Sequence, residues 1–281
     1  MALLSSISSS PRSPSPFLFN HLLHSPPPPP PSCSFISRLC FTSFNLSTQF
    51  SSSPISAMPP SSPKIDTSLL TLDESFYDDE LWAASSLRVR SFREFPPDTF
   101  GLQDLVKCLT EREFEALKER VSGTRAGLRR VSCINASLPE SLVSRICSEL
   151  CSACKFSANG EDRIVVGTLD LNQCLCLPDE ISGTKPEVMG SDITRAYLSN
   201  VCVAKELQRN GLGYALLEKA KMVAYDWGIT DLYVHVAVNN EPARKLYVKS
   251  GFVYESDEPA WQARFLDRPR RLLLWTGLSR A

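Results

Sequence analysis

The stretch from Tyr197 to Phe252 constrains the fold of this chain more than any other part of the sequence. Its hydrophobic pattern predicts a strand, a turn that contains glycine, a helix, a second strand and a second helix, in that order. Strands that alternate with helices are typical of an α/β layer structure. We therefore expect the rest of the chain either to complete the sheet around this unit or to deliver it to a compartment.

Apolar spacing predicts the elements of this unit. We expect a strand over Tyr197–Ala204 and, because apolar residues recur at helical intervals, an amphipathic helix over Leu212–Trp227. A second strand over Leu232–Val238 alternates between two faces. Asn240 is a favourable N-cap for a last helix, which Gly251 ends.

The upstream sequence predicts further elements in a single core that reaches Leu278. The expected strands are Leu87–Phe92, Ser132–Leu138 and Arg163–Leu171, with a tight turn at Asn159-Gly160, and the expected helix is Leu102–Val121. We expect Ile65–Trp82 to be an exposed lead-in, Glu140–Cys154 to be helical or irregular and Gln173–Asp192 to be a loop, with two last strands at Phe252–Tyr254 and Arg271–Trp275.

The N-terminal segment has the composition of an organellar transit peptide. Through Ile65 it has no Asp or Glu and contains 19 Ser and 13 Pro, so it cannot bury a core. Hydroxylated residues outnumber Arg, which favours the chloroplast stroma. We expect residues 1–62 to be a transit peptide, 63–84 a linker and 85–281 the folded domain; the alternative for the first segment is a disordered Pro/Ser interaction tail.

Charge and hydropathy exclude two classes of partner. From Asp66 onward, 27 basic residues stand against 31 acidic ones, a net charge of −4, so there is no basic surface that would indicate a nucleic-acid partner. The sequence also lacks an apolar stretch of the roughly 18 residues that a membrane-spanning helix needs.

The ten cysteines leave three alternatives open. Cys151 and Cys154, together with Cys174 and Cys176, have spacings that could supply four thiolates to zinc. The same residues could form a regulatory thiol pair. We favour the third alternative, buried free thiols, because both pairs lie in apolar surroundings; no metal is expected.

A glycine-containing loop, Gln208–Gly213, follows the first strand of the unit and opens its first helix. Unpaired N–H groups and the positive dipole end of a helix favour an anion there, and Gly211 and Gly213 let a phosphate approach the backbone. The loop lacks the Lys of a phosphate-binding P-loop, and Leu216 replaces the third glycine of a dinucleotide fingerprint. By itself such a loop can also be a surface turn.

A second motif follows at the second helix: Asn240, Ala243, Leu246, Tyr247, Gly251 and Phe252, in the pattern N-x-x-A-x-x-L-Y-x-x-x-G-F. Together the two motifs resemble the GNAT family of acetyl-CoA-dependent N-acetyltransferases, closely over residues 196–254. The resemblance implies a central, mixed and mostly antiparallel sheet of about seven strands with about four flanking helices, whose central strands splay apart.

The resemblance also implies a cofactor site for acetyl-CoA. Its pantetheine arm would pair with the backbone of Val201, Cys202 and Val203. The pyrophosphate would lie on the N–H groups of Arg209, Asn210, Gly211, Leu212, Gly213 and Tyr214. Asn240 matches the residue that holds the arm, with Glu241 and Pro242 beside it, and Tyr247 matches the acid that protonates the departing thiolate. The alternative for Tyr247 is a core aromatic.

The general base is the least determined part of the expected site. His235 is the only histidine beyond the transit-like segment, and in the N-terminal acetyltransferase branch of the family its position carries a base. Tyr197 matches a tyrosine that helps hold a water there. His235 could instead be a hydrogen-bonded histidine inside the sheet, and Asp170 and Glu206 remain alternative bases.

The pKa values of the candidate amines narrow the choice of acceptor. An α-amino group has a pKa of about 7.7–8.0 and a lysine about 10.4, so a weak base suits protein N-termini better. Members of the family that the chain resembles also acetylate lysines, so we expect protein or peptide amines as substrates. The alternatives are an acetyltransferase of arylalkylamines or polyamines, and a CoA-binding regulator without turnover.

Overall fold

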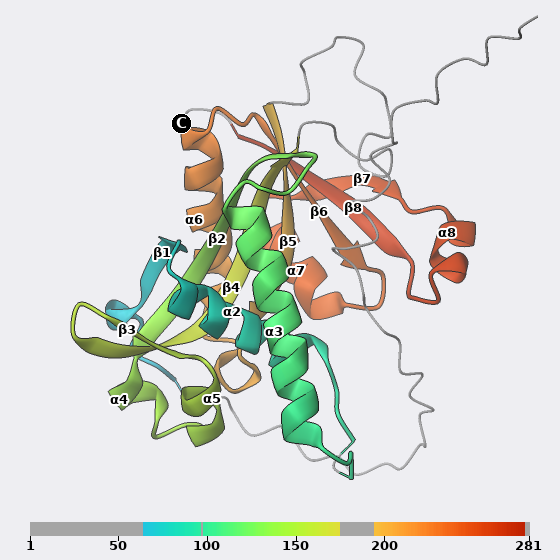
Figure 1. The fold of residues 1–281 in the computed structure, drawn as a ribbon. Coiled ribbons are helices and arrows are strands. Elements are labelled where there is room, and N and C mark those ends of the chain that lie inside the picture. The colour runs from blue at the N-terminus through green and yellow to red at the C-terminus, as the bar shows by residue number, and fades with distance from the viewer. Residues whose placement is uncertain (1–63, 97, 175–193, 279–281) are drawn as a thin grey trace, which may run out of the picture. The chain divides into compact units, whose positions relative to one another are not determined.

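The computed structural model describes residues 64–96, 98–174 and 194–278, which form an eight-stranded sheet with flanking helices (Figure 1). The strands are β1 (Thr71–Ser75), β2 (Leu128–Pro139), β3 (Lys155–Ala158), β4 (Glu161–Cys174), β5 (Arg195–Val203), β6 (Asp231–Ala237), β7 (Val253–Asp257) and β8 (Arg271–Gly277). Their order is β1-β2-β4-β5-β6-β8-β7, with β3 paired to β4. Only β5 and β6 pair in parallel among these described strands.

The described helices are α2 (Asp78–Phe92), α3 (Leu102–Val121), α4 (Glu140–Val143), α5 (Ser148–Ala153), α6 (Leu212–Asp226), α7 (Glu241–Lys249) and α8 (Ala260–Phe265), with short 3₁₀ turns η1 (Thr67–Leu69) and η3 (Lys205–Leu207). A mixed, mostly antiparallel sheet flanked by helices is the fold class expected from the sequence, which is therefore confirmed. The described helices outnumber the expected four because α4, α5 and α8 are short additions.

Helices cover both faces of the sheet. On β4, the side chain of Thr168 accepts a hydrogen bond from Arg88 Nη2 of α2 at 3.1 Å. A Cβ added to the neighbouring Gly167 would lie 2.9 Å from Leu216 Cδ1 of α6. Because consecutive strand residues face opposite sides of a sheet, α2 and α6 pack on opposite faces.

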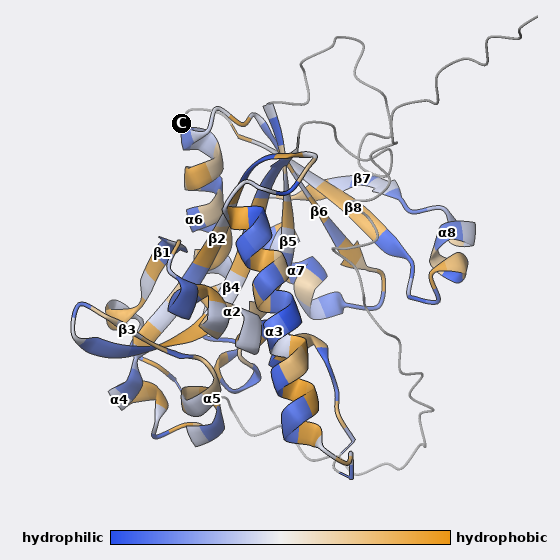
Figure 2. Cartoon of the chain, in the orientation of Figure 1, coloured by the Kyte–Doolittle hydropathy of each residue, from blue (hydrophilic) through white to orange (hydrophobic). Residues whose placement is uncertain are grey.

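Apolar residues concentrate along the strands, whereas α3 carries patches of hydrophilic and hydrophobic residues (Figure 2). The largest buried cluster joins β2, β4, β5 and β6 to α6, with Leu169, Leu198 and Leu216 almost inaccessible. A smaller cluster lies under α2 and α3 and includes Leu81 and Leu117. All described residues belong to one compact unit.

The strand expected at Leu87–Phe92 is wrong, because these residues form the last turns of α2. Asp78, Asp79 and Glu80 occupy the first turn, where acidic residues favour the positive end of a helix. The alternation of apolar and polar residues predicted a strand only on the assumption that Arg88 faces solvent. Arg88 is 2% exposed and lies inside the protein.

The exposed lead-in expected over Ile65–Trp82 is also wrong. Residues Thr71–Ser75 form β1, which pairs antiparallel with β2 and adds an edge strand to the sheet. Ser75 is buried and its hydroxyl accepts a hydrogen bond from Asn135 Nδ2 at 2.8 Å. The elements of the sheet therefore begin inside the segment 63–84 that was expected to be a linker.

Most other expected elements match the structure. Helix α3 spans the residues expected for it, and α6 and α7 end within two residues of expectation. Asn159 and Gly160 make the β3–β4 turn with φ values of 52° and 79°, as a tight hairpin requires. The expected loop Gln173–Asp192 lies almost wholly outside the described residues, as does the segment 1–62.

The central strands part midway along the sheet. Pairing between β5 and β6 runs from Arg195↔Asp231 to Leu198↔Val234. Beyond that point β5 continues beside β4 to Val203, while β6 continues beside β8 to Ala237. The splayed central strands expected from the sequence are therefore present. Among the described helices, none has the length and apolar character to cross a membrane.

Candidate active site

Two of the expected catalytic residues meet where β5 and β6 part. Tyr197 on β5 is opposite Tyr233 in the register, and its side chain extends toward His235, two residues further along β6. Tyr197 Oη and His235 Nδ1 lie 3.1 Å apart, within hydrogen-bond distance, and their ring centroids are 5.7 Å apart. A phenol and an imidazole are therefore in contact next to the last β5–β6 pair, Leu198↔Val234.

The surroundings of His235 keep its imidazole neutral. Burial lowers the pKa of His235 to about 3, and the nearby guanidinium of Arg271 acts in the same direction, whereas Glu258 opposes it. A value of about 3 lies roughly five pH units below the pKa of an α-ammonium group. His235 is thus better suited to orient Tyr197 or a water by a hydrogen bond than to take the proton of an ammonium group itself.

A buried carboxylate, that of Glu258, lies near the His235 imidazole. Glu258 is 6% exposed. Its carboxylate accepts hydrogen bonds from Arg268 Nη1 at 2.7 Å and from Arg271 Nη2 and the Arg271 backbone N–H, both at 3.1 Å. These contacts fix the segment between β7 and β8 next to His235. The two guanidinium groups outnumber the carboxylate, which explains why the cluster disfavours a positive imidazole.

The glycine-containing loop has the backbone conformation of an anion site. Arg209 and Gly211 have φ values of 67° and 83°, in the left-handed region, and Gly211 is the N-cap of the 15-residue helix α6. The first N–H groups of a helix lack intrahelical partners. A Cβ on Gly211 would meet nothing within 4 Å, so the protein itself needs glycine there for its backbone conformation rather than for space.

Asn210 braces this loop through its side chain. Its Nδ2 donates to the carbonyl oxygens of Leu207 at 3.2 Å and Gln208 at 3.3 Å. Its Oδ1 accepts a hydrogen bond from the backbone N–H of Ile65 at 3.3 Å. The expected cofactor role of Asn210 concerned only its backbone; the carboxamide ties the loop to the segment that precedes β1.

The other loop residues lie close to α7. A Cβ added to Gly213 would be 3.0 Å from Leu246 Cδ2, so this glycine permits a close approach of the two helices. Leu212 is 1% exposed and belongs to the main core. Tyr214 is 38% exposed, with Lys249 Nζ 5.4 Å above its ring.

The expected backbone track, Val201 to Val203, forms the end of β5 beyond its pairing with β6. Val201 and Val203 pack against the main core and are partly buried. Cys202 is buried, and burial raises the pKa of its thiol to about 12. Cys202 is therefore a protonated core thiol, and the track offers a cofactor only its backbone.

The expected residues on α7 divide between its surface and the core. Asn240 is exposed and its side chain caps the helix, accepting a hydrogen bond from the Ala243 N–H at 3.2 Å. Glu241 and Pro242 occupy the first turn. Tyr247 is 5% exposed and its ring centroid lies 5.7 Å from that of Phe252. Burial raises the pKa of Tyr247, so its phenol stays protonated at neutral pH.

The alternative bases are engaged in ion pairs. Asp170 is fully buried and is bonded to Arg88 and Arg120. Burial raises the pKa of Glu206, but its hydrogen bonds and Arg90, 2.6 Å away, lower it below its ordinary value overall. Carboxylates held in this way are weak proton acceptors.

The cysteines give no support to a metal site in the described part of the chain. No group of three or more His, Cys, Asp or Glu side chains that could hold a metal occurs among the described residues. Burial raises the pKa of Cys151, and that of Cys154 to about 12, so both are core thiols. Cys176 and the side chain of Cys174, which the zinc alternative needs, lie outside the described residues.

Sequence reasoning missed the Asn210 brace, the Glu258 cluster and the buried network on Asp170. A signal was available for the last of these, because Asp170 is the only charged residue after Arg163 in RIVVGTLDL and Arg88 is one of two charged residues in LRVRSF. A lone charge in an apolar element is buried only with partners. Nothing in the sequence indicated that Ile65 contacts Asn210.

We predict that His235 stays neutral between pH 5 and pH 8, because its folded-state pKa is about 3. Nitrogen-15 NMR of the imidazole should show one neutral tautomer across this range, with the signals assigned by their loss in His235→Gln. A titration midpoint near 6.5 would contradict the assignment. Because the unfolded imidazole binds a proton below about pH 6.5 and the folded one does not, His235 should also lower stability as the pH falls from about 6.5 toward 3.

Comparison with known proteins identifies the family of the chain. A model described as the acetyltransferase (GNAT) family matches residues 148–252. The chain is 63% identical over 216 residues to GCN5-related N-acetyltransferase 7, chloroplastic, of Arabidopsis thaliana, covering 77% of this chain and 79% of that protein. It is 31% identical over 188 residues to GCN5-related N-acetyltransferase 6, chloroplastic, of the same plant, covering 64% of this chain and 60% of the relative.

Among solved structures, the PaiA N-acetyltransferase of Thermoplasma acidophilum in complex with coenzyme A superimposes with a TM-score of 0.44 at 12% identity, over 74% of this chain and 98% of that one. The two plant relatives are chloroplast proteins, which confirms the expected localisation. With 63% identity over more than three quarters of both sequences, the chain belongs to the acetyltransferase (GNAT) family and is an acetyl-CoA-dependent acyltransferase.

Proposed function

We propose that the protein acetylates the α-amino groups of protein N-termini, and also lysine ε-amino groups, in the plastid stroma. The observation that carries the proposal is the contact of Tyr197 with a neutral His235 at the opening between β5 and β6. A site with so weak a base favours amines that are already neutral. At pH 8 roughly half of α-amino groups are neutral, against well under one in a hundred lysines.

In the proposed reaction, acetyl-CoA lies along Val201–Val203 with its pyrophosphate at the loop Arg209–Tyr214. The lone pair of the amine attacks the thioester carbonyl, the carbon–sulfur bond breaks, and the amine nitrogen loses its proton to water oriented by Tyr197 and His235. The departing CoA sulfur takes a proton from Tyr247, whose phenol burial keeps protonated. The Tyr247 phenolate then regains a proton from water, which balances the proton that the amine released. The products are an amide and free CoA thiol.

The acidic runs give little support to a small cationic substrate. Asp78 is paired with Lys118 at 2.5 Å. Asp257 and Glu258 are paired with Arg270 and Arg268. Carboxylates neutralised in this way attract a free polyamine only weakly, so we favour a peptide acceptor over an arylalkylamine or a polyamine.

The acceptor class can be tested with the full chain, acetyl-CoA and a mixed pool of amines. The pool should contain peptides with free N-termini and blocked lysines, peptides with blocked N-termini and free lysines, an arylalkylamine and a polyamine. We expect acetylated N-termini first and acetylated lysines more slowly, with products read by mass. Acetylation confined to the small amines would contradict the proposal, and binding of acetyl-CoA without any product would indicate a CoA-binding regulator.

We predict that Tyr247→Phe lowers kcat by about a hundredfold or more, since one general acid–base group contributes about a hundred- to ten-thousandfold. The ring of Phe keeps the packing against Phe252, so the affinity for acetyl-CoA should stay within about threefold. Tyr225→Phe, at an exposed position on α6, is the matched control and should leave kcat unchanged. An unaltered kcat in Tyr247→Phe would remove this residue as the acid.

We predict that Gly211→Val lowers the affinity for acetyl-CoA at least tenfold, because valine strongly disfavours the φ of 83° at this position. Gly123→Val is the matched control: its φ is 74° and a Cβ there also meets nothing within 4 Å. Both variants should lose similar stability in thermal unfolding, but Gly123→Val should bind acetyl-CoA normally. Equal affinities for acetyl-CoA in the two variants would show that the loop at Gly211 does not bind the cofactor.

A further inference from the structure

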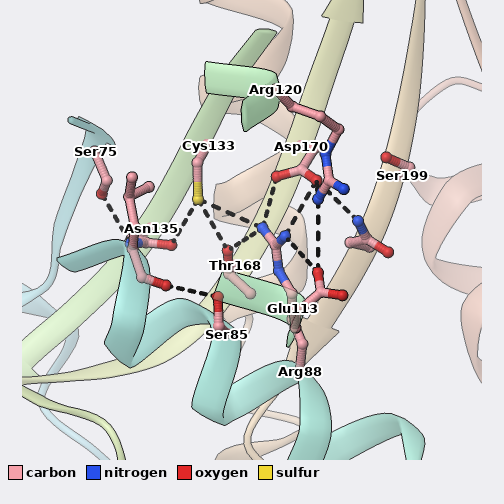
Figure 3. Close-up of polar contacts among 12 residues, drawn as sticks. Ser75, Ser85, Arg88, Glu113, Arg120, Cys133, Asn135, Thr168, Asp170 and Ser199 are labelled. Carbon is pink, nitrogen blue, oxygen red and sulfur yellow. Dashed lines mark hydrogen bonds and ion pairs between the residues drawn. The ribbon is translucent and has the colours of Figure 1, made fainter. Parts of the chain in front are cut away.

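Figure 3 shows a buried polar network around Asp170. Asp170 pairs with Ser199, the residue after the last β5–β6 pair at Leu198. Asp170 lies on β4 and is 0% exposed. Asp170 Oδ1 accepts from Arg88 Nη2 at 2.6 Å, and Oδ2 accepts from Arg88 Nη1 at 3.1 Å and Arg120 Nη2 at 3.2 Å. Glu113 adds a second carboxylate at 3.3 Å from Arg88 Nη1. Two helices, α2 and α3, thus place their arginines on one carboxylate.

The same carboxylate holds a strained residue on β5. Asn200 Nδ2 donates to Asp170 Oδ2 at 2.8 Å. Asn200 has a φ of 54°, which is uncommon for a residue other than glycine and unusual inside a strand. Asparagine tolerates this left-handed conformation better than most residues, and the hydrogen bond to Asp170 stabilises it further.

Asn200 is part of a bulge in the pairing of β4 with β5. The register passes from Asp170↔Ser199 to Thr168↔Cys202, so β5 has one more residue than β4 over this interval. A bulge bends the strand and changes the direction of the groups that follow it. Here it comes directly after the last β5–β6 pair, Leu198↔Val234, and directly before Val201.

A second β4 side chain holds the other side of the bulge. Asn172 Nδ2 donates to the Tyr197 carbonyl oxygen at 3.1 Å and to Ser199 Oγ at 3.0 Å. Asn172 and Asp170 therefore contact β5 on both sides of Leu198. The segment that carries Tyr197 and leads into the expected track is fixed by side chains of β4 as well as by the backbone ladder.

We propose that Asp170 is a positioning residue for acetyl transfer. Through Asn200 it sets the bulge that directs Val201–Val203 toward the thioester. Through Arg88 and Arg120 it keeps α2 and α3 in a fixed position relative to that bulge. The inference rests on the proposed path of acetyl-CoA along β5. Asp170 does not touch the reacting atoms; it acts through Asn200. A misplacement of reacting groups by about 1 Å can lower a rate about a hundredfold, so loss of this contact should affect kcat.

Two substitutions at Asn200 separate the hydrogen bond from the backbone conformation. Asn200→Gly keeps easy access to positive φ but loses the donor to Asp170, whereas Asn200→Ala loses both. The matched controls are Asn159→Gly and Asn159→Ala in the exposed β3–β4 turn, where Asn159 has a φ of 52°. These controls report the stability cost of the same changes at a position outside the site.

In the full chain, Asn200→Gly should lower kcat about tenfold or more while KM for acetyl-CoA changes less than about threefold and thermal stability matches Asn159→Gly. Asn200→Ala should lower kcat at least as much. A normal kcat in Asn200→Gly with a low kcat in Asn200→Ala would overturn the proposal, because it would show that only the backbone conformation matters.

A double-mutant cycle tests the link to α3. Arg120→Met leaves Arg88 to neutralise Asp170, so the protein should fold. If both residues act through Asp170, the loss of kcat in Arg120→Met combined with Asn200→Gly should be smaller than the product of the single losses. Independent, multiplicative losses would contradict a shared carboxylate.

A spectroscopic measurement tests the role of Asp170 without depending on which acceptor amine the protein uses. The carbonyl ¹³C chemical shift of bound acetyl-CoA, labelled at the carbonyl carbon, reports how the protein polarises the thioester. It should move toward the value of free acetyl-CoA in Asn200→Gly and remain at the wild-type value in Asn159→Gly, even if no acceptor is turned over. An identical shift in wild type and Asn200→Gly would overturn the proposal.

Discussion

The parting of β5 and β6 after Leu198↔Val234 is the constraint on which the rest of the structure depends. Backbone N–H and C=O groups need partners, and a strand that leaves its neighbour exposes an edge that an extended ligand can pair with. The bulge at Asn200 and the contact of Tyr197 with His235 lie beside this opening. We propose that acetyl-CoA pairs with backbone groups at this gap.

Polar contacts within the protein decide which groups at the opening can react. Asp170 and Glu206 are occupied by arginines, so neither is a free base. His235 is neutral because of burial and Arg271. The chemistry that we propose for the site is therefore hydrogen bonding and orientation by Tyr197 and His235 and protonation of the thiolate by Tyr247. These roles suit an amine that reaches the site already neutral. Because the proposed site has no strong base, we favour protein N-termini as substrates.

The sequence predicted the C-terminal half of the fold better than the N-terminal half, for a physical reason. In α6, β6 and α7 the apolar positions face the core and the polar ones face solvent, so periodicity reports burial. In α2 a buried Arg88 replaces an apolar residue, and its pairing with Asp170 comes from 82 residues away, which no local pattern contains. Among site residues, Tyr197 and His235 were brought together as expected, while the Asn210 brace depends on a contact with Ile65 that only the folded chain reveals.

The most direct measurement of the central claim is the set of backbone amide chemical shifts of the protein during titration with coenzyme A. If the gap between β5 and β6 is the cofactor site, the largest changes will fall on Val201–Val203 and Arg209–Tyr214, with smaller changes at Asn240. Saturable binding that leaves these two segments unchanged, or perturbs only residues elsewhere on the sheet, would contradict the account.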